Sequence, residues 1–158
     1  FTRCVAPSLR ISYIVLPPEP MNHYEKKFSF ISCGVSPLEQ RVLTEFMEGG
    51  YFESYINKAR KIYKTKREFL ISQLKILGEK AVVSGEKAGH HILLKYDGKL
   101  SEKEMILRAK MRKVRIYPVS SYYINGNPPK SSVILGYGGL DEKQIYEGVK
   151  RLAQAWQD

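Results

Sequence analysis

Two of the three histidines are adjacent, at His90 and His91, within a stretch whose pattern predicts a strand. Neighbouring side chains on a strand point to opposite faces, so we expect that these two imidazoles cannot bind one metal ion together. The third histidine, His23, and the two cysteines, Cys4 and Cys33, are scattered along the sequence without the spacing of a metal site. The sequence therefore predicts no metal site and two reduced thiols in a cytoplasmic protein.

Three glycines, Gly136, Gly138 and Gly139, follow a predicted strand and precede a predicted helix. Their spacing matches neither of the familiar phosphate-binding glycine motifs, so they predict a tight turn from strand into helix. The serines and cysteines of the chain lack the sequence context of a nucleophile elbow. Hydrolase chemistry is therefore not indicated.

Two arginines in the opening segment, FTRCVAPSLRISY, are the more promising groups: Arg3 and, seven residues later, Arg10. A guanidinium is planar and always charged, so it pairs well with phosphate or carboxylate but is a poor nucleophile. The segment resembles the cofactor-lysine motif of MocR/GabR-like transcription regulators of the GntR type, which reads G-T-F-S-K-S, then a short apolar stretch with proline, then R-I-x-Y. The resemblance implies that Arg10 contacts the phosphate of pyridoxal phosphate.

The same resemblance places Arg3 at the position of the lysine that forms the Schiff base with that cofactor, so no residue of this chain is expected to be catalytic. A second departure is Ser121, in Ser120-Ser121-Tyr122-Tyr123, where many relatives have an arginine that grips the carboxylate of an amino-acid ligand. Ser121 and Tyr122 are accordingly the substrate-binding positions that the resemblance implies. The resemblance to this family covers nearly the whole chain in order. Its matching segments are 38–46, 58–63, 85–94, 114–118, 122–123, 135–138 and the closing helix to Trp156.

The resemblance also implies a domain division and partners. Residues 1–18 correspond to a remnant of the large cofactor-binding domain, 19–50 to a connecting segment and helix, 51–78 to a long linking helix, and 79–158 to a small C-terminal domain. The sequence starts without methionine or a leader, so we expect it to begin inside a longer protein. In the family, the full-length protein binds pyridoxal phosphate and an amino-acid-like effector, dimerises, and contacts DNA through a domain further upstream; for these residues alone we expect no bound cofactor.

Composition supports an ordinary globular domain: 158 residues, 43% of them hydrophobic, provide material for one sizeable core. The longest apolar run, 11–16, is far too short to cross a membrane. The net charge of +10 includes one local concentration, formed by Arg60, Lys61, Lys64, Lys66 and Arg67. We favour a solvated outer helix face at this cluster over a nucleic-acid groove, because charge alone decides little.

The pattern predicts a buried strand at 10–16, ended by two prolines, and an ambiguous stretch at 19–34. Ser36, Pro37 and Glu39 predict a helix start with a capping box, and Gly49-Gly50 its end. Apolar residues of period near 3.6 from Phe52 to Leu77 then predict one long helix, ended by Gly78.

Beyond Gly78 the sequence predicts strands at 80–84, 90–96, 114–119 and 132–137. A second capping box, at Ser101 to Glu104, opens a helix to about residue 112, and a last amphipathic helix starts at Asp141. Strands alternating with helices predict an α/β or α+β sandwich, with one small sheet covered by helices on one side. By resemblance this is the small domain of aminotransferase fold type I, preceded by a long interdomain helix.

Three functions stay open. We favour the effector-sensing and dimerisation part of an aminotransferase-like transcription regulator. The first alternative is the C-terminal domain of a pyridoxal-phosphate-dependent aminotransferase with Arg3 at the lysine position. The second alternative is a nucleic-acid-binding module that uses the basic face of the long helix.

Overall fold

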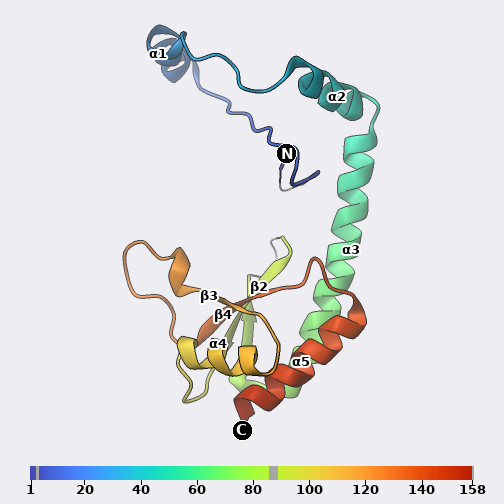
Figure 1. Ribbon diagram of the computed structural model, residues 1–158, viewed down its shortest axis with the longest axis vertical. Coiled ribbons are helices and arrows are strands. Elements are labelled where there is room, and N and C mark those ends of the chain that lie inside the picture. Colours follow the sequence, from blue (N-terminus) through green and yellow to red (C-terminus); the bar gives the residue numbers. More distant parts are fainter. Residues whose placement is uncertain (3, 86–88, 158) are drawn as a thin grey trace. The chain divides into compact units, whose positions relative to one another are not determined.

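The computed structural model describes residues 1–2, 4–85 and 89–157. These residues form two compact units, Phe1–Arg60 and Lys61–Asp158, and helix α3 (Tyr51–Leu74) begins in the first unit and ends in the second (Figure 1). Each unit is described separately below.

The first unit contains two short helices, α1 (Pro18–Phe28) and α2 (Pro37–Glu48), before α3 begins. Both start at a proline, whose fixed φ suits the first helical position. Helix α1 lies in the stretch that the sequence left ambiguous. Helix α2 ends at Gly49-Gly50, and Gly50 has the positive φ of 73° that this exit was expected to need.

The predicted capping box at the start of α2 is wrong. Ser36 occupies the N-cap position, but its hydroxyl makes no capping hydrogen bond. Only its backbone carbonyl takes part, accepting a hydrogen bond from the amide of Gln40 at 3.0 Å. A residue pattern specifies which side chains are able to cap, whereas the bond also requires the serine rotamer that points at the helix.

The predicted strand at 10–16 is also wrong, because this stretch is extended but joins no sheet. Ile11 is buried, whereas Ile14 and Val15 are 77% and 81% exposed. A strand needs a neighbour that accepts and donates its backbone hydrogen bonds along its length, and no described strand forms such a ladder with this segment.

The second unit is built on a four-stranded antiparallel sheet with the order β1-β2-β4-β3. The end of α3 passes through a 3₁₀ segment, Lys75–Lys80, where Gly78 turns the chain with a φ of 70°. The strands are β1 (Ala81–Ser84), β2 (His91–Tyr96), β3 (Tyr117–Pro118) and β4 (Ser132–Gly136).

Strand β3 is much shorter than the predicted 114–119. The amide of Val114 donates instead to the carbonyl of Ala109 at the end of helix α4 (Glu102–Met111), at 2.9 Å. Pro118 has no amide to give to the ladder. The apolar residues Ile116 and Val119 are still buried, so the pattern indicated burial correctly but not strand pairing.

Helices cover one face of this sheet, as the sequence predicted. Alternate residues of β2, namely Ile92, Leu94 and Tyr96, are buried, whereas His91 and Lys95 are exposed and Leu93 is half-buried. Helices α4 and α5 (Glu142–Gln157) lie next to each other against the sheet (Figure 1). The predicted stripe of α5 is buried along its whole length; its members are Ile145, Val149, Leu152 and Trp156.

Two sets of side-chain hydrogen bonds stabilise these helices. The capping box of α4 is present, because the Ser101 hydroxyl accepts from the amide of Glu104 at 3.3 Å while the Glu104 carboxylate accepts from the Ser101 amide at 2.7 Å. The buried indole of Trp156 donates to the carbonyl of Met105 at 3.1 Å, which ties α5 to α4. The small sheet with its helix layer therefore has the predicted α/β architecture.

Candidate functional site

The opening segment forms a closed loop within the first unit. The charged amino group of Phe1 donates to the carbonyl of Ile11 at 2.8 Å, and the Thr2 hydroxyl donates to the carbonyl of Leu9 at 2.7 Å. The loop is held to the start of α3 because the Tyr55 hydroxyl donates to the carbonyl of Val5 at 3.1 Å. These bonds give the segment a defined shape without a sheet partner.

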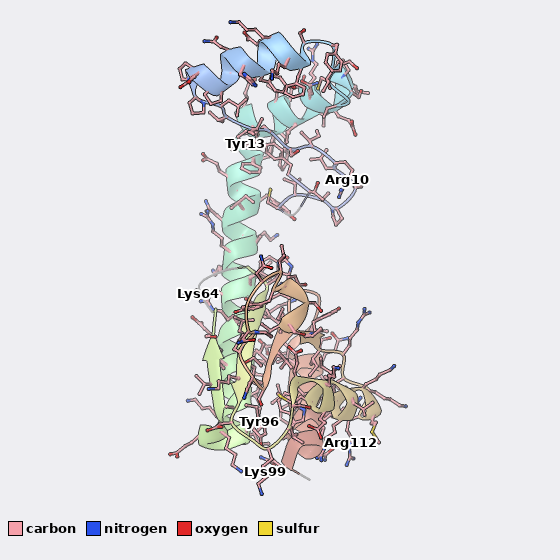
Figure 2. All side chains as sticks on the ribbon, turned by 90° about the vertical axis from the view of Figure 1, so that its left-hand side faces the viewer. Arg10, Tyr13, Lys64, Tyr96, Lys99 and Arg112 are labelled. Atoms are coloured by element: carbon pink, nitrogen blue, oxygen red, sulfur yellow. The ribbon has the colours of Figure 1, made fainter. Side chains whose placement is uncertain are left out.

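Arg10 lies on this loop with an exposed side chain, labelled in Figure 2. An exposed guanidinium on a tethered loop has the donor geometry to pair with a phosphate. Arg3, the other predicted cofactor position, lies outside the described residues.

Ser121 and Tyr122 lie in the second unit, on the single 3₁₀ turn Ser120–Tyr122 that follows β3. Both are exposed, Tyr122 by 73%. The structure thus places Arg10 in one compact unit and the Ser121–Tyr122 pair in the other.

One carboxylate, that of Glu102, anchors this turn. Its Oε1 accepts hydrogen bonds from the amides of Val119 at 2.6 Å and Ser120 at 3.0 Å, and its Oε2 accepts from the Ser120 hydroxyl at 2.5 Å. Glu102 is the first residue of α4, so the helix end that carries the capping box also positions the turn. Sequence reasoning missed this role, because a glutamate in a first helical turn gives no signal of a partner so far along the chain.

The two adjacent histidines are arranged differently from the prediction. His90 lies in a turn before β2 rather than on the strand, and its ring centroid is 4.3 Å from that of His91. The expectation that the imidazoles point to opposite faces is therefore wrong, since alternation holds only where both residues are extended. Partial burial, and to a lesser extent the neighbouring His90, hold the pKa of His91 below its ordinary value of 6.5.

These histidines line a cavity of about 640 Å³ in the second unit, bordered by the segment before β3, the turn after β4 and the first half of α5. The described residues contain no group of three or more His, Cys, Asp or Glu side chains that could hold a metal ion. Both cysteines are free and exposed.

The basic cluster on α3 is not one solvated face. Lys64 is exposed and lies 3.9 Å from the carboxylate of Glu68. Arg67, however, is half-buried, and its charge acts on the pKa of Tyr137. The predicted outer-face position of Arg67 is wrong because the second half of α3 packs on the sheet, where Leu70 and Leu74 are buried.

Among the described residues, no helix combines the length and the apolar character that membrane crossing requires.

The sequence has relatives among both regulators and enzymes, although no protein-family model matches it. It is 39% identical, over 99% of its length, to the uncharacterized HTH-type transcriptional regulator YdeL of Bacillus subtilis strain 168, and covers 34% of that protein. It is 27% identical, again over 99% of its length, to the probable rhizopine catabolism regulatory protein MocR of Rhizobium meliloti, covering 32% of it. The 2-aminoadipate transaminase of Thermus thermophilus is 25% identical over 98% of this chain and 39% of the enzyme. The chain thus spans about a third of the length of these relatives.

Solved aminotransferase structures share the fold. The multiple substrate aminotransferase of Thermococcus profundus superimposes with a TM-score of 0.86 at 23% identity, over 99% of this chain and 39% of the enzyme. The Pyrococcus horikoshii kynurenine aminotransferase gives 0.84 at 29% identity, over 98% of this chain and 38% of the enzyme. Relatives and fold together identify the 158 residues as homologous to MocR-like helix-turn-helix regulators and to fold type I aminotransferases, with the fold of the C-terminal part of their aminotransferase-like domain.

Proposed function

We propose that these residues are the effector-sensing and dimerising part of a cytoplasmic, aminotransferase-like transcription regulator. The similarity to a helix-turn-helix regulator over 99% of the chain carries this proposal. The chain would serve a longer protein in which an N-terminal domain binds DNA, and an amino-acid-like effector would bind near Ser121 and Tyr122.

The residues present do not fit covalent attachment of pyridoxal phosphate. Attachment needs a primary amine, and the position that the motif gives to lysine holds Arg3, whose guanidinium is always protonated. Arg10 does fit a phosphate, because its side chain is exposed on a tethered loop. A regulator that senses its effector without catalysis accounts for both features.

The cofactor part of the proposal is tested by exchanging Arg3→Lys in the complete protein and titrating pyridoxal phosphate. The parent protein should give no visible absorption band from covalent attachment, whereas the lysine variant should acquire one. Adding Arg10→Gln to that variant should weaken binding, while Lys26→Gln, an exposed charge in the same unit, should not. A covalent band in the parent protein would contradict our assignment of Arg3.

Dimerisation and effector sensing need separate measurements. Light scattering of the complete protein should give twice the monomer mass. Amino acids screened by thermal shift should include one that stabilises it, since a ligand that binds only the folded state raises its stability. Ser121→Arg should strengthen binding of that amino acid, because it supplies a bidentate partner for a carboxylate. Ser84→Arg, at another exposed serine of the second unit, serves as the control. Failure of every amino acid to shift the unfolding transition would remove the sensing proposal.

The second candidate is a working aminotransferase, favoured by the similarity to the Thermus transaminase. It requires a primary amine elsewhere in the complete protein to attach the cofactor, because Arg3 supplies none. Transamination between an amino acid and a 2-oxo acid by the unmodified complete protein would establish it. Activity that appears only after Arg3→Lys would instead support the regulator.

A further inference from the structure

The cavity beside the histidine pair has an unusual charge balance for its size. Its volume of about 640 Å³ lies within the range of small-molecule sites, roughly 300–1,000 Å³. Its lining contains one acidic residue, Glu147, and six basic residues that come from three segments of the second unit. The basic lining residues are His90, His91, Lys113, Arg115, Lys143 and Arg151.

Two glycines make room for the two imidazoles. A Cβ atom added at Gly138 would lie 2.9 Å from the Cβ of His90, and one added at Gly136 would lie 3.2 Å from Cδ2 of His91. Real Cβ atoms essentially never approach another atom to under 3.0 Å, so a side chain at 138 would displace His90. The close packing of His90 against the backbone therefore requires glycine at position 138.

Hydrogen bonds fix the backbone around the pair. The hydroxyl of Tyr137 donates to the carbonyl of Gly89 at 2.8 Å, and its amide donates to the carbonyl of His90 at 3.1 Å. Lys66 donates to the carbonyl of Gly138 at 3.1 Å. Burial raises the pKa of the Tyr137 hydroxyl above its ordinary value of 10.0, which further favours the protonated form that donates this bond. The histidine wall of the cavity is thus held in place before any ligand arrives.

The cations of the opposite walls are available to a ligand. Arg115 is exposed and lies over the ring of Tyr117, 5.2 Å from its centroid. Lys143 and Arg151 are exposed on α5, and none of these three cations forms an ion pair among the described residues. Bringing such charges together costs repulsion that a bound anion would relieve.

We propose that this cavity binds a small phosphate-bearing anion between the histidine pair and the cations of Arg115 and Lys143. A phosphate offers three acceptor oxygens pointing in different directions, which suits donors on separate walls better than the planar carboxylate does. This site is distinct from the Arg10 and Ser121 positions, and the inference does not depend on the proposed function.

The test is a calorimetric titration of the chain with inorganic phosphate, with a nucleoside monophosphate and with succinate. Phosphate and the monophosphate should bind saturably at millimolar concentration or below, and succinate more weakly. Tighter binding of the monophosphate than of phosphate would identify an organic phosphate as the ligand, and the reverse order would identify the free ion. Absence of saturable binding by both, or equally strong binding of succinate, would overturn the proposal.

Variants then locate the site. Arg115→Gln combined with Lys143→Gln should weaken phosphate binding at least about tenfold, which corresponds to about 1.4 kcal/mol. Lys150→Gln removes an exposed charge from the same helix outside the cavity and should leave binding nearly unchanged. Equal losses in the double variant and the control would show a diffuse charge effect and overturn the site.

Gly138→Ala provides an independent check that leaves every charge in place. The added Cβ should push His90 from its position and weaken phosphate binding, while far-ultraviolet circular dichroism confirms that the chain still folds. Gly34→Ala is the control outside the cavity, because a Cβ there also meets no atom within 4 Å. Unchanged binding in Gly138→Ala would show that the imidazoles do not contact the anion.

Discussion

Replacing Glu102 by alanine should loosen the turn that carries Ser121 and Tyr122 and destabilise the second unit. The carboxylate accepts three hydrogen bonds from Val119 and Ser120, at 2.6, 3.0 and 2.5 Å. Ser120 is exposed, so water replaces the two bonds that it donates. Val119 is only 4% exposed, and its amide would lose a partner where water reaches poorly.

The expected cost follows from these exposures. An unsatisfied buried amide costs about 1–3 kcal/mol, and losing a negative charge from the first helical turn costs about 0.3–1 kcal/mol. Glu102→Ala should therefore lower the free energy of unfolding by about 1.3–4 kcal/mol, the sum of these two contributions. Urea unfolding followed by the fluorescence of Trp156, the single tryptophan, reports on this unit.

The matched control is Glu142→Ala, because Glu142 is likewise the first residue of its helix, α5. Its loss should cost only the helix-end contribution, about 0.3–1 kcal/mol. If the two variants unfold with free energies within about 0.5 kcal/mol of each other, the carboxylate of Glu102 does not hold the turn and the reasoning fails.

Further predictions concern the helix caps, the core and pH. Trp156→Phe removes the bond to the Met105 carbonyl and should cost about 1–2 kcal/mol, measured by circular dichroism in urea; a loss no larger than the scatter between preparations would argue against that bond. Ser101→Ala should cost about 1 kcal/mol whereas Ser36→Ala should cost almost nothing, because only the former caps its helix; equal costs would contradict this. Since the pKa of His91 is lower in the folded chain than its ordinary 6.5, its contribution to stability is present above that pH and is lost as the pH falls below it. Stability should therefore decline less steeply below about pH 6.5 in His91→Gln than in the parent, and identical profiles would refute the lowered pKa.

Local sequence determined most of the regular structure. Period and capping residues located α2, α4 and α5 to within a residue or two, because they act over one or two helical turns. The apolar run at 90–96 also predicted β2, although the strand begins one residue later, at His91. The ordered motif matches likewise indicated the aminotransferase fold.

Tertiary structure decided every feature that depends on residues far apart in the chain. Whether 10–16 becomes a strand depends on a neighbour, and the length of β3 depends on how α4 ends. The bond from Glu102 to the Ser120 turn and the room that Gly138 leaves for His90 are equally invisible in the sequence. Hydrogen bonds and close packing act over a few ångströms in space, whereas a sequence pattern records only neighbours along the chain.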